Sequence, residues 1–227
     1  MERKVHFIPK EYYHIYSRGV EKRKIFLEEK DYARFQALLY ILNQKNLFYL
    51  SDFLKSGKRD TSDVYYEKRE NTLVSILVYS LMPNHFHLVI YENEEGGISK
   101  FMGKLLTAYS MYFNLKHKRS GGLFVHPFRS EHISDDIYFK HIFSYIHLNC
   151  VDLLQSNWKE EGIMDKKLSQ KFLEDYEYSS YPDFIKKTKA KGRNESLIID
   201  FNSVPEFISI ISLDISDFEK WFKGGLY

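Results

Sequence analysis

The strongest pattern in the chain is a pair of neighbouring apolar runs near its middle. Residues 72–81 are almost all apolar or β-branched, and after the turn residues Pro83-Asn84 a second run continues over residues 85–91. Two such runs joined by a tight turn predict a β-hairpin. Since successive side chains of a strand point to opposite faces, His85 and His87 would share one face of the second strand.

A strand and a helix are expected before this hairpin. Residues 12–17 are rich in aromatic and β-branched side chains and end at Arg18-Gly19, which predicts a strand followed by a turn. Apolar residues then recur at helical spacing up to about Asn43, with Asp31 as the expected N-cap. Residues 55–71 are charged and nearly free of aliphatic side chains, so we expect an exposed loop there.

Two helices and one more strand are expected after the hairpin. Ser99 or a neighbour opens a long helix that ends in the basic residues 116–119. Residues 123–129 contain a proline, so this segment is expected to be an edge strand. One of the aspartates at 135–136 then caps a helix that reaches about Leu154.

This order of elements predicts an α+β fold with a ferredoxin-like core. Strand, helix, strand, strand, helix, strand is the order of an antiparallel four-stranded sheet with helices on one face, and the helix before Leu154 is an addition to it. The periodicity is weaker from Gln155 onward, where a basic run spans residues 186–193. We therefore expect a core domain over residues 1–154 and a helical extension over residues 155–227.

Composition narrows the class of protein. The 33 basic and 31 acidic residues nearly cancel, so any nucleic-acid surface must be local. A single cysteine excludes a disulfide framework and a cysteine-rich zinc module, which favours a reducing compartment. No apolar run approaches the roughly 20 residues that cross a bilayer, and the N-terminus lacks an apolar signal core. We expect a soluble, cytoplasmic protein without a membrane partner.

Candidate chemistry comes from combining the histidine strand with the helix before Leu154. Tyr145 and Asn149 stand at i and i+4, so they lie on one helix face, and His141 shares that face one turn earlier. If the face lies against His85 and His87, two imidazoles and one amide oxygen can hold a metal that acts as a Lewis acid on a phosphodiester. Tyr145 would then attack phosphorus, provided that a cation or a base lowers its phenol pKa of about 10.

Each of these residues also has an ordinary structural interpretation. A histidine on a strand face is more often packed or solvated than a metal ligand. A tyrosine in a chain with 18 of them is by default a core aromatic, and an asparagine near a helix end is a common polar group. His147 is expected to be structural because it leaves the shared face. The metal hypothesis therefore depends on the combination and not on any single residue.

At this point the sequence resembles the HUH single-tyrosine transposases, and within them the REP-associated tyrosine transposases. The similarity runs from about Tyr12 to Tyr181. It is carried by Tyr13-His14-Ile15-Tyr16-Ser17-Arg18-Gly19, Ile25-Phe26, Asp31-Tyr32, Met82-Pro83-Asn84-His85-Phe86-His87, Tyr145-Ile146-His147-Leu148-Asn149 and Tyr178-Ser179-Ser180-Tyr181. One departure is visible, because related sequences commonly have Asn-Pro where this chain has Asn149-Cys150.

The resemblance implies an activity, a cofactor and partners. By analogy, His85, His87 and Asn149 bind a divalent ion, magnesium or manganese, and no nucleotide cofactor is needed. Tyr145 attacks single-stranded or hairpin DNA and leaves a 5′-phosphotyrosine and a free 3′-hydroxyl, with His141 as a possible accessory residue. The helix that carries Tyr145 becomes the catalytic helix, residues 1–154 the catalytic domain, and a homodimer is a possible assembly.

Contacts with DNA are harder to assign from sequence. Candidates for binding backbone phosphates are Arg18, Lys116, Lys118, Arg119 and Arg129. Solvated surface charge is the alternative for each of them. For the basic cluster at 116–119, a favourable interaction with the helix dipole explains the residues equally well.

The predicted function is that of a metal-dependent DNA transposase that cleaves and rejoins single-stranded or hairpin DNA through a covalent phosphotyrosine. Two alternatives stay open. The chain could be a catalytically silent protein that binds hairpin DNA or RNA. It could also be an HUH nicking endonuclease with a host role, acting as a hydrolytic nuclease or a relaxase.

Overall fold

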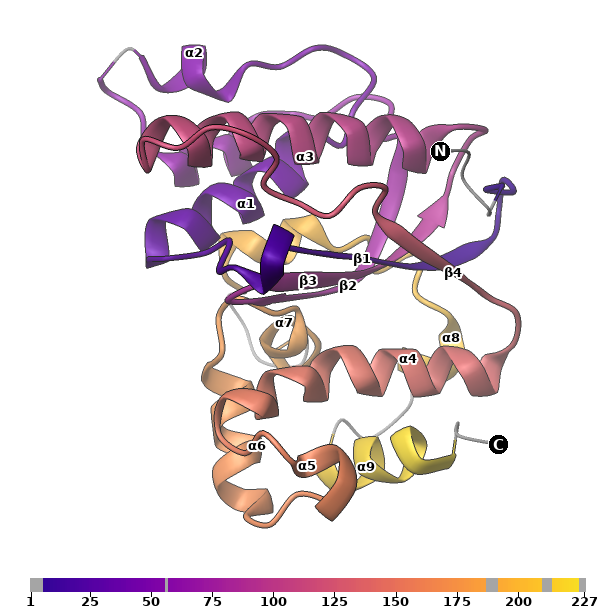
Figure 1. Ribbon diagram of the computed structural model, residues 1–227. Coiled ribbons are helices and arrows are strands. Elements are labelled where there is room, and N and C mark those ends of the chain that lie inside the picture. The colour runs from indigo at the N-terminus through magenta and orange to yellow at the C-terminus, as the bar shows by residue number, and fades with distance from the viewer. Residues whose placement is uncertain (1–5, 56, 187–191, 210–213, 225–227) are drawn as a thin grey trace.

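The computed structural model describes residues 6–55, 57–186, 192–209 and 214–224 (Figure 1). The α-helices and strands in chain order are β1 (Tyr12–Arg18), α1 (Glu29–Ile41), α2 (Leu50–Leu54), β2 (Val74–Met82), β3 (His85–Glu92), α3 (Gly97–Lys116), β4 (Arg129–Ile133), α4 (Asp136–Leu148), α5 (Trp158–Glu161), α6 (Lys166–Asp175), α7 (Tyr181–Lys186), α8 (Glu206–Ser209) and α9 (Ile215–Gly224).

The four strands form one antiparallel sheet in the order β2-β3-β1-β4. Together with α1 between β1 and β2 and α3 between β3 and β4, this is the ferredoxin-like arrangement, which confirms the predicted α+β fold. The register pairs Arg18 with His85 and Tyr16 with His87, so the end of β1 lies beside the start of the histidine strand.

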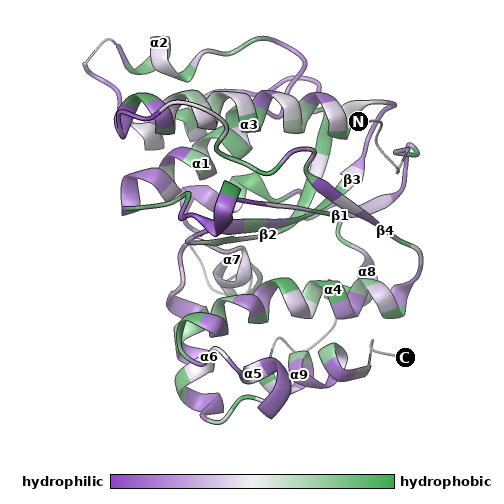
Figure 2. Cartoon of the chain, in the orientation of Figure 1, coloured by the Kyte–Doolittle hydropathy of each residue, from purple (hydrophilic) through white to green (hydrophobic). Residues whose placement is uncertain are grey.

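Helices α1 and α3 cover one face of this sheet, and α4 covers the other (Figure 1). On the first face Phe35 of α1 packs on Phe86 of β3 with 5.1 Å between ring centroids, and Tyr109 of α3 packs on Phe35 at 4.9 Å. Every residue of β2 is buried, as expected for a strand enclosed on both faces, and its apolar composition is visible in Figure 2. Of the helices α1, α3 and α4, only α4 therefore lies on the second face of the sheet.

Two predicted boundaries are wrong. The edge strand is Arg129–Ile133 and not residues 123–129, because Phe124 makes only an isolated bridge to Gly19 and pairing with β1 begins at Arg129. Helix α1 begins at Glu29 with Glu28 as N-cap, so Asp31 lies in the first turn. Its buried carboxylate accepts a hydrogen bond from the Leu27 amide at 2.9 Å, which anchors the chain that enters the helix.

The predicted exposed loop at 55–71 is only partly a loop. A 3₁₀ segment, Thr61–Tyr66, is closed by a capping box between Asp60 and Asp63. Val64 and Tyr65 within it are buried, and the Tyr65 ring lies 5.2 Å from the Tyr40 ring of α1. This segment therefore completes the core beside α1.

The chain after Leu154 packs on α4 and on the open side of β2. Helix α9 lies along α4, and the Ser180 amide donates to the Tyr79 carbonyl of β2 at 2.9 Å. Arg193 forms a buried ion pair with Asp183 at 2.8 Å, while residues 187–191 of the predicted basic run lie outside the described residues. The division at Leu154 into a domain and an extension stays a prediction. In the described part of the chain, no helix has both the length and the apolar character of a membrane span.

Candidate metal and nucleophile site

The face of the sheet that α4 covers gathers the polar residues singled out in the sequence. His85 and His87 project from β3, and their rings stand nearly perpendicular with centroids 5.0 Å apart. Asn149 caps the C-terminus of α4, and Tyr145 lies one turn before it. Helix α4 begins at an aspartate cap, Asp135, whose side chain accepts from the Tyr138 amide at 2.8 Å. That cap and the length of α4 decide how far Tyr145 reaches along the sheet.

His85 is held on both of its ring nitrogens. Its Nδ1 lies 2.7 Å from the Asn84 side-chain oxygen, and its Nε2 lies 2.9 Å from the Asn149 amide nitrogen. The asparagine oxygen at position 84 only accepts, so Nδ1 carries the proton and the Nε2 lone pair points toward Asn149. Two neighbouring ligands of an octahedral Mg²⁺ stand about 3 Å apart, so this spacing suits two ligands of one ion once the Asn149 amide presents its oxygen.

His87 is buried between β3, β1 and α4. Its Nδ1 lies 2.8 Å from Nε2 of His14, which faces the same side from β1. The Tyr145 ring stands edge-on to the His87 ring with 5.4 Å between centroids. Nε2 of His87 makes no hydrogen bond within the described residues and is the nitrogen available to a ligand.

Both strand histidines are neutral at physiological pH. Burial, followed by the positive charges of Lys159 and Arg18, lowers the pKa of His85 to about 4. Burial and the neighbouring His14 and His85 hold the pKa of His87 well below its usual value. Because only neutral imidazole binds a metal, these shifts favour metal binding at neutral pH.

The candidate ligands for a divalent ion include no charged side chain. No group of three or more His, Cys, Asp and Glu that could hold a metal occurs in the described residues. The candidate set is instead two imidazole nitrogens and one amide oxygen, all neutral. Such a set leaves positions open for anionic oxygens, which a phosphodiester supplies.

Tyr145 is half-buried, and its hydroxyl makes no hydrogen bond within the described residues. Burial, followed by the negative charge of Asp152, raises the pKa of the phenol. Lys159 Nζ lies 5.3 Å from the centroid of the Tyr145 ring and is the cation beside it. The ring also stacks on Phe222 of α9 with 6.1 Å between centroids.

Three residues of the site were missed by the sequence analysis: Lys159, His14 and Glu131. Lys159 follows the predicted catalytic helix, and its Nζ lies 3.3 Å from the Asn149 oxygen and 3.2 Å from Asp152. His14 was visible only as a member of the first strand motif. Glu131 falls beyond the predicted edge strand, so correct placement of β4 would have set it opposite His14.

Other histidines and the cysteine have structural surroundings. His141 donates from Nδ1 to the Phe222 carbonyl at 2.9 Å and stacks on the Phe222 ring, which ties α4 to α9. His147 is buried and its Nε2 lies 2.9 Å from the Ser180 hydroxyl, in agreement with the structural role expected for it. Cys150 is buried 3.1 Å from the Ser80 hydroxyl, so the residue that replaces the commoner proline packs against β2.

The candidate phosphate-binding residues fall on different parts of the molecule. Arg18 is exposed at the end of β1, and its charge acts on the pKa of His85. Arg129 is exposed on β4 opposite Tyr16. Lys116, Lys118 and Arg119 lie at the end of α3, which covers the other face of the sheet.

The side chains of these last three residues differ in their ion pairs and hydrogen bonds. Lys116 is paired with the carboxylates of Asp31 at 2.7 Å and Glu28 at 2.5 Å. Arg119 donates to the Asn114 side chain at 2.7 Å, whereas Lys118 is exposed. Arg18 is therefore the predicted DNA contact that lies nearest the histidines.

Gly19 sets the position of Arg18. The Gly19 amide donates to the Asn84 carbonyl at 2.9 Å, which ties the end of β1 to the turn before His85. A Cβ on Gly19 would lie 2.3 Å from the Arg23 carbonyl oxygen, so any larger residue would displace the chain there. The Arg18-Gly19 motif thus fixes a cation at the edge of the histidine site.

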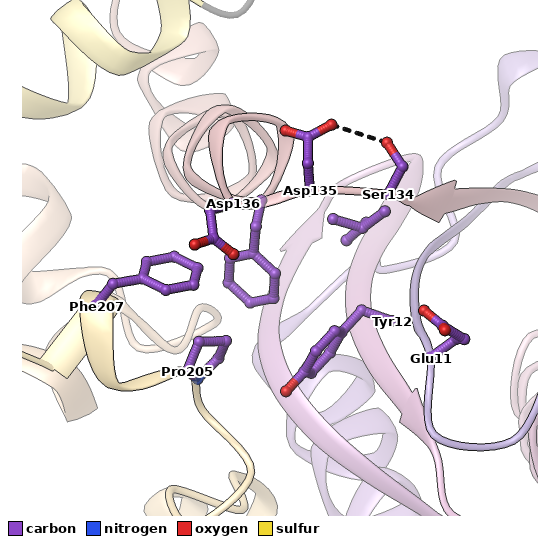
Figure 3. Close-up of a pocket in the computed structure, with 9 residues that line it drawn as sticks. Glu11, Tyr12, Ser134, Asp135, Asp136, Pro205 and Phe207 are labelled. Atoms are coloured by element: carbon purple, nitrogen blue, oxygen red, sulfur yellow. Dashed lines mark hydrogen bonds between the residues drawn. The ribbon is translucent and has the colours of Figure 1, made fainter.

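A cavity of about 350 Å³ lies at the other end of the sheet (Figure 3). It is lined by Glu11, Tyr12, Ile133, Ser134, Asp135, Asp136, Phe139, Pro205 and Phe207. Tyr12 is the first residue of β1 and Arg18, which pairs with His85, is the last, so this cavity is separate from the histidines. Its acidic rim does not suit a nucleic acid.

The chain is similar to known proteins in part of its sequence and in its fold. Residues 53–149 match the family described as "Transposase IS200 like". A solved structure, that of a REP-associated tyrosine transposase bound to a REP hairpin, superposes with a TM-score of 0.49 at 12% sequence identity. The superposition covers 93% of this chain and 99% of the chain in that structure. No curated protein sequence matches the chain. The predicted resemblance is therefore confirmed, and the matched segment 53–149 contains His85, His87, Tyr145 and Asn149.

Proposed function

We propose that this protein cleaves and rejoins single-stranded or hairpin DNA in a metal-dependent reaction with Tyr145 as nucleophile. The observation that carries the proposal is that Tyr145 of α4 and Asn149 at its C-cap lie against His85 and His87 of β3 on one face of the sheet. Asn149 lies against His85 at 2.9 Å, and the Tyr145 ring lies against His87 at 5.4 Å between centroids. A candidate ligand set and a phenol with a free hydroxyl thus border the same space.

His85, His87 and Asn149 would hold a divalent ion, Mg²⁺ or Mn²⁺, which when bound supplies Lewis-acid polarisation of the scissile phosphate. The Tyr145 hydroxyl loses its proton to solvent and its oxygen forms a bond to phosphorus, while the bond from phosphorus to the 3′-oxygen breaks and that oxygen takes up a proton from solvent. The products are a 5′-phosphotyrosine and a strand with a free 3′-hydroxyl. Because the phosphodiester energy is conserved in that ester, a 3′-hydroxyl can reverse the reaction without a nucleotide cofactor.

Lys159 supplies the positive charge that the phenol requires. Burial raises the pKa of Tyr145, so a phenolate is costly there unless a cation lies close. Lys159 Nζ lies 5.3 Å from the ring centroid. A phosphate that enters the site would meet the same ammonium group, so Lys159 favours both the nucleophile and its target.

DNA would approach over the exposed edge that carries Arg18 and Arg129. Both side chains are exposed and belong to the strands β1 and β4 that border the histidine site. Phosphate contacts of this kind position a strand without reading its sequence. Lys116 is neutralised by two carboxylates on the other face, so we assign it no direct part in holding DNA.

The nucleophile is tested with Tyr145→Phe. The wild-type protein, incubated with a 3′-labelled single-stranded hairpin oligonucleotide and Mn²⁺, should form a labelled covalent protein–DNA adduct that survives denaturing electrophoresis. The phenylalanine variant should bind the oligonucleotide with wild-type affinity and form no adduct. Tyr66→Phe, at a tyrosine that is 77% exposed, is the control and should react normally.

Two outcomes would contradict this proposal. Adduct formation by Tyr145→Phe at the native rate would show that another residue is the nucleophile. Hairpin binding by the wild-type protein without any adduct in Mg²⁺ or Mn²⁺ would favour the catalytically silent binding protein.

A further inference from the structure

A row of polar groups runs across the sheet from the buried His87 on β3, through His14 on β1, to an exposed carboxylate on β4. Nδ1 of His87 lies 2.8 Å from Nε2 of His14, and Nδ1 of His14 lies 3.7 Å from the Glu131 carboxylate on β4. The His14 ring is 3% exposed, and its Nδ1 has no partner at hydrogen-bond distance. The carboxylate is the charged group that this buried nitrogen faces.

Glu131 is itself held in place by two tyrosines. The Tyr16 hydroxyl donates to one carboxylate oxygen at 2.8 Å, and the Tyr138 hydroxyl donates to the other at 3.0 Å. The nearby His14 ring and the Tyr16 hydroxyl hold the pKa of Glu131 down, to about 2. A fixed negative charge therefore stands at the end of the row.

With both imidazoles neutral, the row allows only one arrangement of protons that avoids a repulsive contact. Across the 2.8 Å contact, one of the two imidazoles must donate and the other must accept. If His14 donated from Nε2, its Nδ1 lone pair would face the Glu131 carboxylate, and His87 would carry its proton on Nε2. If His87 donates from Nδ1, the His14 proton sits on Nδ1 and faces the carboxylate, while the Nε2 lone pair of His87 is free.

We propose that Glu131, acting through His14, keeps the proton of His87 on Nδ1 and so makes Nε2 the metal-binding nitrogen. This inference rests on the metal site of the proposed function. His14 and Glu131 are positioning residues, since they would act on the metal ligand only through the His87 ring, although the His14 ring also packs edge-on to the Tyr145 ring with 6.3 Å between centroids. A carboxylate that orients a ligand histidine directly is a common arrangement in metal sites, and here a second imidazole is inserted between the two.

The tautomers are measured first, in the metal-free protein. Nitrogen-15 NMR of histidine side chains distinguishes a protonated ring nitrogen from one with a lone pair. We expect His87 and His14 to be protonated on Nδ1 in the wild-type protein. A proton on Nε2 of His87 would overturn the inference, whatever metal the protein binds.

The near-isosteric variant Glu131→Gln then tests the cause. Its neutral amide can donate as well as accept, so it no longer favours one tautomer of His14. We expect a mixture of His87 tautomers and a loss of Mn²⁺ affinity of roughly 10-fold or more, measured by titration calorimetry. The matched control is Glu11→Gln, which breaks a comparable histidine–carboxylate contact, to His132 at 3.1 Å, away from the site. That variant should keep both the tautomers and the affinity.

The outcomes separate this inference from the proposed function. If Glu131→Gln leaves either the His87 tautomer or the Mn²⁺ affinity unchanged, the inference is wrong, although the metal site can still be correct. If His87→Ala retains wild-type Mn²⁺ affinity, the metal site itself is wrong. In that case the inference fails as a statement about metal binding, and the failure is attributed to the proposed function.

Discussion

Replacing Lys159 with methionine removes the cation beside the proposed nucleophile and leaves a side chain of similar length. Lys159 Nζ lies 5.3 Å from the Tyr145 ring centroid and 3.2 Å from the Asp152 carboxylate. The ammonium group stabilises a phenolate, whereas Asp152 opposes it and raises the pKa of the phenol. Lys159→Met and Asp152→Asn should therefore act in opposite directions on the same hydroxyl.

The size of the effect follows from Coulomb's law. If the phenolate charge is placed at the ring centroid, 5.3 Å from Nζ, it interacts with the ammonium group by about 3 kcal/mol at an effective dielectric constant of about 20. Asp152 offsets part of this stabilisation because it pairs with the same ammonium group. Each 1.4 kcal/mol corresponds to a factor of about ten in rate, so Lys159→Met should slow adduct formation roughly 10- to 100-fold.

The assay is single-turnover formation of the covalent adduct with saturating oligonucleotide and Mn²⁺, followed between pH 6.5 and 9.5. In Lys159→Met the rate should be lower at neutral pH and should recover as the pH rises, because the phenol then ionises without help. Lys166→Met is the matched control, since that lysine of α6 pairs with Glu219 of α9 at 2.9 Å and does not contact Tyr145.

Asp152→Asn should react at least as fast as the wild-type protein, because the neighbouring negative charge is gone. The reasoning is refuted if Lys159→Met reacts at the wild-type rate across this pH range. It is also refuted if the two variants change the rate in the same direction.

Two further predictions concern metal binding and stability. Burial lowers the pKa of His85 to about 4, so protons compete with the metal for this histidine only near that pH. The Mn²⁺ affinity measured by calorimetry should therefore change little between pH 7.5 and about 5. A fall in affinity centred near pH 6.5 would instead indicate an ordinary, solvated histidine. Arg193→Met leaves the carboxylate of Asp183, which is 1% exposed, without its ion pair and should destabilise the protein by about 3 kcal/mol in urea unfolding. The double variant with Asp183→Leu should recover most of that loss, and a single variant as stable as the wild type would contradict the importance of the pair.

Much of the fold could be predicted because it depends on local patterns. The apolar run of β2, the turn at Pro83-Asn84 and the alternation in β3 each follow from short-range geometry, and the order of elements then limits the sheet to few topologies. The edge strand was placed about six residues too early. An edge strand pairs on one side only, so its position is set by its partner β1 and not by its own composition.

The candidate site divides in the same way. The sequence by itself determined that His85 and His87 share a face and that Tyr145 and Asn149 share another, because strand and helix periods are properties of the backbone. Only the tertiary structure decided that these two faces meet, and that Lys159, His14 and Glu131 join them. Contacts between residues far apart in the chain depend on how the elements pack, and no local repeat records that packing.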